Sequence, residues 1–192
     1  MLLTIELGNL ANETKIGDSI AINGVCLTVA KLEGNLATFD VSEETLTKST
    51  LGRLKPSSPV NVEPAMKAAG RFGGHFVQGH IDGTAIIKTI ERQGLFANIK
   101  FEASGELLDQ MIIKGSVAVD GISLTIANMD SNSFAISVIP ETLKKTTLGT
   151  AKAGDSVNIE IDIIVKTVKK QLEAILPERQ NLTMEKLKEL GF

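Results

Sequence analysis

The chain has 192 residues, of which 43% are hydrophobic and 22% charged, a composition typical of globular rather than disordered proteins. This length allows two domains of roughly 90 residues each. The net charge of −3 comes without a basic block, which excludes a nucleic-acid surface, and the apolar runs are too short to span a membrane.

The first segment, residues 1–7, alternates between apolar and polar residues and predicts a strand. It lacks the basic head, apolar stretch and cleavage site of a signal peptide. The chain has a single cysteine, Cys26, which cannot form an internal disulfide and fits a reducing compartment. We therefore expect a cytoplasmic protein.

Residues 17–65 and 114–162 form an internal repeat with a constant offset of 97 residues and no gap. Residues 19–29 and 116–126 are identical at five of eleven positions, and residues 44–52 and 141–149 at seven of nine. Two copies are too few for a solenoid, which needs about three or more stacked units. The repeat therefore predicts two sister domains.

Alternating apolar residues and turn signals such as Gly34-Asn35 favour a compact antiparallel barrel in each copy. About 20 residues before the second copy's strand at 97–101 have no counterpart before the first copy's strand at 3–7. We expect the first barrel to lack its opening strand, which would leave an unpaired edge. Either the chain is truncated at its N-terminus, or another segment or subunit fills the gap. The expected units are residues 1–75, 76–163 and a helical segment, 164–192.

Cys26 is the first residue of chemical interest and follows the turn-prone pair Asn23-Gly24. A lone cysteine is commonly a small buried hydrophobic residue. The equivalent residue of the second copy is Ser123, a poor replacement for a buried apolar group. The pair favours a polar role at this position, as a nucleophile, a hydrogen-bond donor or a group that positions water.

His75 and His80 are the two histidines, and both lie in a glycine-rich segment, residues 73–83. A third nitrogen or sulfur ligand is not near them in the sequence, so we expect no metal site. The histidines are five positions apart, so they fall on opposite faces of a regular strand. We expect one of the two to be structural, and because glycines allow a ligand to approach the backbone, we expect His80 to contact a ligand.

The copies differ at two further polar positions. Lys114 and Asp162 of the second copy stand where the first has Gly17 and Ala65. Such residues are often surface charges, but a lysine and a carboxylate gained on one side of a duplicated site would let that pocket handle protons. The sequence contains no glycine-rich phosphate loop, nucleophile elbow or paired-cysteine metal motif.

After Asp162 the apolar period changes to that of a helix, with a seam at Val165, Val168, Leu172 and Ile175. Pro177 is expected to end this helix, and Thr183 to cap a short second one. The seam packs either on its own barrel or, as we prefer, in an oligomer.

These motifs resemble riboflavin synthase, of the alpha-chain type with lumazine-binding repeats. The matching segments cover nearly the whole chain and appear in the right order, at residues 23–28, 73–80, 114–125, 140–143 and 157–162. The resemblance implies an all-β fold of two tandem six-stranded Greek-key barrels, the first lacking its opening strand, plus a C-terminal α-helix. It also implies a homotrimer whose active site lies between the N-terminal barrel of one subunit and the C-terminal barrel of the next.

The activity implied by the resemblance is the dismutation of two 6,7-dimethyl-8-ribityllumazine molecules into riboflavin and 5-amino-6-ribitylamino-2,4-pyrimidinedione. A four-carbon unit moves between them without a cofactor or metal. The resemblance places these residues at the reacting centre or in support of it: Cys26, Ser123, Asp162, Lys114, Thr125, His80 and Ser19. It assigns substrate contacts to Cys26, Leu27, Thr28, Asp40, Val41, Ser42, Glu43, Glu44, Thr45, Gly79, His80, Ile81, Lys114, Ser123, Leu124, Thr125, Ser137, Val138, Ile139, Pro140, Glu141 and Thr142.

Two other functions fit the resemblance less well. A non-catalytic lumazine- or flavin-binding antenna protein would tend to lose the reactive positions, whereas Cys26, Ser123 and Asp162 are all present. A flavin-dependent reductase would need a nicotinamide-binding βαβ unit, and the sequence has no strand, glycine-rich loop and helix in that order. Partners expected for the enzyme are the lumazine, two further copies of the chain and, as an association, lumazine synthase.

Overall fold

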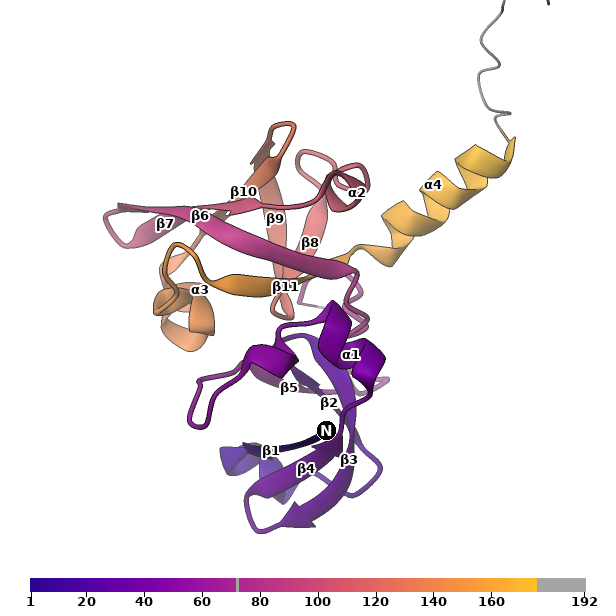
Figure 1. The fold of residues 1–192 in the computed structure, drawn as a ribbon, viewed down its shortest axis with the longest axis vertical. Coiled ribbons are helices and arrows are strands. Elements are labelled where there is room, and N and C mark those ends of the chain that lie inside the picture. The colour runs from indigo at the N-terminus through magenta and orange to yellow at the C-terminus, as the bar shows by residue number, and fades with distance from the viewer. Residues whose placement is uncertain (72, 176–192) are drawn as a thin grey trace, which may run out of the picture.

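The computed structural model describes residues 1–71 and 73–175, and their strands divide into two antiparallel groups (Figure 1). The expected end of the helix at Pro177 and the second helix near Thr183 lie outside this range. The N-terminal group is a five-stranded sheet in the order β1-β4-β3-β2-β5, and the C-terminal group is a closed barrel in the order β10-β7-β6-β11-β8-β9. The all-β tandem fold is confirmed.

The N-terminal sheet contains β1 (Leu2–Glu6), β2 (Ser19–Ile22), β3 (Val25–Glu33), β4 (Leu36–Asp40) and β5 (Val62–Pro64). Short helical segments connect its strands: η1 (Gly8–Asn12), α1 (Glu43–Lys48) and η2 (Leu51–Arg53). Alternation along β3 buries Val25, Leu27 and Val29 in the core and leaves Cys26 exposed. Cys26 is therefore not a buried hydrophobic residue.

The C-terminal barrel contains β6 (Gly83–Gln93), β7 (Phe96–Glu102), β8 (Ser116–Val119), β9 (Ile122–Met129), β10 (Ser133–Val138) and β11 (Ser156–Ile161). Its helical segments are α2 (Gly105–Leu108), α3 (Pro140–Lys145) and η3 (Thr147–Gly149). The rings of Phe101 and Phe134 stack in its core with centroids 5.0 Å apart. Each half has its own hydrophobic cluster.

Strand β6 closes the second barrel by pairing with both β7 and β11. In the first half, β1 and β5 correspond to β7 and β11. β1 pairs only with β4, and β5 pairs only with β2. Among the described residues the outer edges of β1 and β5 are therefore unpaired, as the repeat predicts. A hollow of about 740 Å³ lies along β1, and residues 1–6 are among those that line it.

The halves meet at two glycines that lie in equivalent turns of the repeat. Gly24 and Gly121 both have a positive φ, of 77° and 81°. Their backbones approach so closely that a Cβ built on Gly24 would lie 2.5 Å from the backbone nitrogen of Gly121. Only glycine fits a contact of this kind, so the Asn-Gly and Asp-Gly turns of the repeat form the centre of the interface.

Asn61 and Asn158, equivalent residues of the repeat, connect the halves by hydrogen bonds. Asn61 Nδ2 donates to the carbonyl of Asp120 over 3.1 Å, and Asn158 Nδ2 donates to the carbonyl of Asn23 over 2.8 Å. Each side-chain oxygen accepts a backbone N–H of the other half, from Thr147 and Thr50 respectively. The four bonds are partly or fully buried, so they contribute more than exposed ones would.

Asp120 and Asn23 are the one chemical difference in this otherwise symmetric network. Both residues accept a backbone N–H through Oδ1 over 2.8 Å, Asn23 from Asn61 and Asp120 from Asn158. Asp120 is 6% exposed, and burial raises the pKa of its carboxyl from 3.8 to about 7, against a smaller opposite effect of the Asn158 hydrogen bond. Asp120 therefore has a carboxyl at the position where the equivalent residue of the first copy, Asn23, makes the same hydrogen bond with an amide.

Asp120→Asn is expected to stabilise the protein above pH 7 by on the order of 2 to 4 kcal/mol. Because the folded-state pKa lies above the unfolded value, the wild-type protein loses stability as the pH rises from about 4 to about 7. The variant lacks this loss, so the two proteins converge below pH 4. Urea unfolding at several pH values measures the difference, and Asn23→Asp, the reverse change, is expected to destabilise at high pH. Parallel pH profiles for wild type and Asp120→Asn would contradict the assignment.

The helix α4 (Ile163–Ile175) leaves the end of β11 and points away from the barrel (Figure 1). It is held at its start by Lys166, whose Nζ lies 2.9 Å from both carboxylate oxygens of Asp82. The apolar residues exposed along it are Ile164, Val168, Leu172 and Ile175, each at least half exposed. Val165, expected in the seam, is partly buried, so Ile164 takes its place.

Candidate functional site

The two central strand pairs of the repeat present small polar residues on their outer faces. In the first half Ser19 pairs with Thr28 and Ala21 with Cys26, across β2 and β3. In the second half Ser116 pairs with Thr125 and Ala118 with Ser123, across β8 and β9. Because cross-strand partners lie side by side on one face, each half carries a strip of short side chains that leaves room for a flat ligand.

The connection between the halves crosses both strips. The carbonyl of Gly79 accepts the Cys26 N–H over 3.0 Å, and a Cβ on Gly79 would lie 2.5 Å from the Cys26 Cβ. At the other end a Cβ on Gly74 would overlap Ser123 Oγ. The segment can lie this close because it has hydrogen atoms instead of side chains at both contacts.

A hollow of about 440 Å³ lies beside this connection and contains both members of the repeated pair, Cys26 and Ser123. Ser19, Gly79 and His75 also line it. The volume is in the range of small-molecule sites, which are roughly 300 to 1,000 Å³. The structure therefore brings together Cys26, Ser123, Ser19 and Gly79, four of the residues that the sequence predicted for the site.

His75 is the polar partner of Ser123. Its ring Nδ1 lies 2.8 Å from Ser123 Oγ, and its backbone N–H donates to the same oxygen over 3.3 Å. Burial lowers the pKa of His75 below the usual histidine value, and the negative charge of Asp162 partly opposes this effect. The imidazole is therefore neutral at pH 7.

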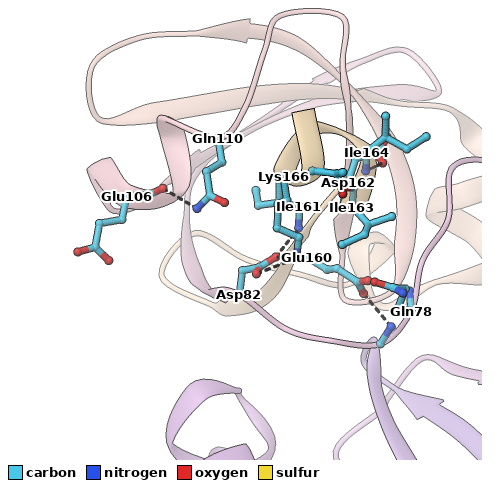
Figure 2. A network of polar contacts seen from close by, with 12 residues as sticks. Gln78, Asp82, Glu106, Gln110, Glu160, Ile161, Asp162, Ile163, Ile164 and Lys166 are labelled. Atoms are coloured by element: carbon cyan, nitrogen blue, oxygen red, sulfur yellow. Dashed lines mark hydrogen bonds and ion pairs between the residues drawn. The ribbon is translucent and has the colours of Figure 1, made fainter. Parts of the chain in front are cut away.

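Glu160 holds the connection between the halves through hydrogen bonds to its backbone. Its carboxylate accepts the backbone N–H groups of Gln78 and Gly79 over 2.7 and 2.9 Å, and its side chain is almost fully buried (Figure 2). Burial raises the pKa of Glu160, while these two hydrogen bonds and the charge of Lys166 act against the rise. The equivalent Glu63 is exposed at the first half's open edge.

The remaining predicted reactive residues do not line the hollow. Asp162 lies where β11 ends and α4 begins, and its Oδ1 accepts the Ile164 N–H over 2.9 Å (Figure 2). Lys114 is exposed in the turn before β8 with a φ of 68°, where the first copy has Gly17 with a φ of 92°. Thr125 and His80 are exposed. Within the described residues Lys114 and His80 form no side-chain hydrogen bond or ion pair.

The predicted substrate contacts at residues 40–45 and 137–142 lie at the ends of β4 and β10 and in the equivalent segments that follow. Ser42 caps α1 by accepting the Thr45 N–H over 3.1 Å, and Ser137 donates to Asn98 Oδ1 over 2.7 Å. Ile139 is 53% exposed at the start of α3. The side chains of five predicted contacts point into or pack against a hydrophobic core, so a ligand would meet their backbone: Leu27, Val41, Ile81, Leu124 and Val138.

Sequence reasoning missed the role of two residues in this site. It assigned the glycine-supported ligand contact to His80 and no role to His75, whose ring contacts Ser123. The Gly73-Gly74 pair directly before His75 was the signal, since a glycine pair permits the close approach that Gly74 makes. Glu160 was seen only as part of a repeated Val-Asn-Ile-Glu segment.

A metal-binding cluster and a membrane-spanning helix are both absent from residues 1–71 and 73–175. No group of three or more His, Cys, Asp or Glu side chains lies close enough together to hold a metal ion there. In the same residues no helix combines the length and the apolar character needed to cross a membrane.

Structural comparison places the fold beside LumP. The crystal structure of LumP complexed with riboflavin matches 83% of this chain and 87% of that one, with a TM-score of 0.78 and 22% identity. The structure of LumP complexed with 6,7-dimethyl-8-(1'-D-ribityl) lumazine matches 79% of this chain, with a TM-score of 0.72 and 21% identity. At these identities the likeness concerns the fold.

Sequence comparison is more specific. The lumazine binding domain family matches residues 2–65 and 78–162, each of which contains one copy of the repeat. Riboflavin synthase of Actinobacillus pleuropneumoniae is 44% identical over 193 residues, covering 100% of this chain and 90% of that protein. Riboflavin synthase of Bacillus subtilis is 41% identical over 196 residues, with the same coverages. The chain therefore belongs to the riboflavin synthase family of enzymes, whose lumazine-binding domain it contains twice.

Proposed function

We propose that the chain converts two molecules of 6,7-dimethyl-8-ribityllumazine into riboflavin and 5-amino-6-ribitylamino-2,4-pyrimidinedione by transferring a four-carbon unit. The observation that carries the proposal is the duplicated strip, in which Cys26 and Ser123 occupy equivalent positions and line one hollow. Two like sites suit two like substrates. The proposed units are two lumazine-binding halves, residues 1–75 and 76–163.

The chemistry asks mainly for positioning. The 7-methyl group of the lumazine is acidic, because its carbanion delocalises into the electron-poor ring, so a protein that stacks two ligands and moves protons can promote the reaction. Holding reactants in a near-attack pose contributes roughly 7 to 11 kcal/mol of barrier lowering. In this proposal Ser123 or Cys26 positions the nucleophile that adds at carbon 7, Asp162 accepts protons, and Lys114, Thr125, Ser19 and His80 support them.

Incubation of the purified protein with the lumazine tests the function. Riboflavin, identified by its fluorescence and by chromatography, is expected to form over many turnovers, with one pyrimidinedione released per riboflavin. Stoichiometric binding of lumazine without riboflavin formation would overturn the proposal and favour the antenna-type binding protein.

We also propose that the active assembly is a cytoplasmic homotrimer in which α4 contacts neighbouring copies. Support comes from the row Ile164, Val168, Leu172 and Ile175, which is at least half exposed on a helix that points away from its barrel. Exposed apolar rows of this kind mark interaction sites. An association with lumazine synthase is a further part of the proposal.

Leu172→Asp is expected to dissociate this assembly, because it places a charge in the centre of the apolar row. Sedimentation should then give the mass of a single chain, 20.5 kDa. The matched control is Gln171→Asp, which adds the same charge at an exposed neighbour outside the row and should leave the mass unchanged. An unaltered mass for Leu172→Asp would remove α4 from the interface.

A further inference from the structure

The contact between His75 and Ser123 has no counterpart in the first copy of the repeat. Ser123 Oγ lies 2.8 Å from the imidazole Nδ1, whereas Cys26, at the equivalent position, faces the backbone of Gly79. The single connection between the halves causes this difference, because it passes Ser123 with a histidine and Cys26 with a glycine. Two positions that the repeat makes equivalent therefore have different polar surroundings.

The donors around Ser123 Oγ determine the direction of its hydroxyl. The backbone N–H of His75 already donates to one lone pair of this oxygen over 3.3 Å. In the tautomer whose Nδ1 carries no proton, the neutral imidazole accepts the hydroxyl hydrogen at this nitrogen, 2.8 Å away. When the His75 N–H occupies one lone pair and the hydroxyl hydrogen points to Nδ1, the second lone pair of Oγ is left for a ligand in the hollow.

The surroundings of the imidazole keep it in the neutral state that this arrangement needs. Its Nε2 is buried and has no hydrogen-bond partner among the described residues. An imidazolium would carry N–H groups on both nitrogens, so Nδ1 could no longer accept the serine hydrogen. The described ionisable groups near the ring are Asp162, next to the start of α4, and Cys26 and Glu63, which line the same hollow. The charge of Asp162 acts against the neutral form but is outweighed by burial.

The backbone holds the ring in place from both sides. Gly74 packs directly on Ser123, where a Cβ would overlap Oγ, so the chain before His75 has no freedom to move inward. After His75, the buried Glu160 carboxylate holds Gln78 and Gly79 through their N–H groups. The ring is therefore oriented by fixed backbone on each side, as second-layer residues of active sites commonly are.

We propose that His75 is the positioning residue of Ser123: its Nδ1 accepts the hydroxyl hydrogen and turns an Oγ lone pair toward the bound lumazine. His80, which sequence reasoning had favoured, has no such contact within the described residues. The inference rests on the proposed function for its catalytic consequence, whereas the hydrogen bond itself can be tested without turnover.

Two substitutions separate the ring nitrogens. His75→Asn keeps a polar atom near the place of Nδ1, and His75→Gln keeps one near that of Nε2. We expect His75→Gln to lower kcat by about 10- to 100-fold with KM within about threefold, and His75→Asn to recover most of the loss. In a Ser123→Ala background His75→Gln should have no further effect. An equal loss in both variants, or a further tenfold loss in the Ser123→Ala background, would overturn the proposal.

Nitrogen-15 NMR of the histidine rings provides the readout that does not depend on activity. The chain has two histidines, so His80→Asn assigns the spectrum. At pH 7 His75 is expected to be neutral with its proton on Nε2, and Ser123→Ala should shift the Nδ1 resonance. A proton on Nδ1, or a spectrum unchanged by Ser123→Ala, would refute the hydrogen bond. A wild-type protein that shows the expected spectrum but forms no riboflavin would refute the proposed function and leave the pair intact.

Discussion

Ser123→Ala is expected to lower the turnover of lumazine by about 100- to 1,000-fold, with lumazine binding changed by less than about threefold. In the proposed mechanism the loss of this oxygen removes the group that positions the nucleophile but little of the surface that holds the ligand. Asp162→Asn, which keeps the shape of the side chain and removes its charge, should also lower turnover while leaving binding largely intact. Steady-state rates and a fluorescence titration of lumazine measure the two effects separately.

The control for this pair is Ser156→Ala, the same chemical change at a serine that accepts a hydrogen bond from Arg53 outside the hollow. Its turnover should match that of the wild type. Cys26→Ser is expected to lose less than Cys26→Ala, because the repeat already carries a serine at this position. Unchanged turnover in both Ser123→Ala and Asp162→Asn would refute their assignment to the reacting centre.

The sequence predicted the sheets because their physical signals are local. Alternation in residues 25–29 determines which side chains enter the core, and the glycines of the Asn23-Gly24 and Asp120-Gly121 pairs adopt a positive φ. The repeat also predicted the unpaired edges of β1 and β5, since β6 has no copy. The core alternation and the turns follow from short-range sequence patterns that occur in both copies, so a pattern in one copy supports the same prediction for the other.

The contacts of the connecting segment could not be predicted in the same way. Residues 66–82 lie outside the repeat, so no second copy reveals which of their positions matter. Choosing between His75 and His80 required the direction of each side chain, which glycines on both sides leave undetermined. The hydrogen bonds of Asn61 and Asn158 were equally hidden, because each bond forms only when the two halves meet.

Gly24→Ala is expected to have the largest effect on stability, about 3 to 5 kcal/mol. Two costs add at this position: a positive φ, worth roughly 1 to 2 kcal/mol for a residue with a Cβ, and overpacking against the opposite turn. The new Cβ would lie 2.5 Å from the backbone nitrogen of Gly121 and 2.9 Å from its Cα. Backbone on both sides cannot move away as a flexible side chain would, so the halves must separate or distort.

Gly17→Ala isolates the first of these costs. Gly17 has a φ of 92°, and nothing lies within 4 Å of a Cβ built there. Its expected loss is therefore only the 1 to 2 kcal/mol of the backbone conformation. Urea unfolding measures the loss of stability in both variants, and the difference between the two losses is the contribution of the contact between Gly24 and Gly121. Because Asn61 and Asn158 cross beside the same turns, Gly24→Ala should also increase hydrogen exchange at the Thr50 and Thr147 N–H groups that these side chains hold. Equal losses of stability in the two variants would mean that the halves are not held together at Gly24 and Gly121.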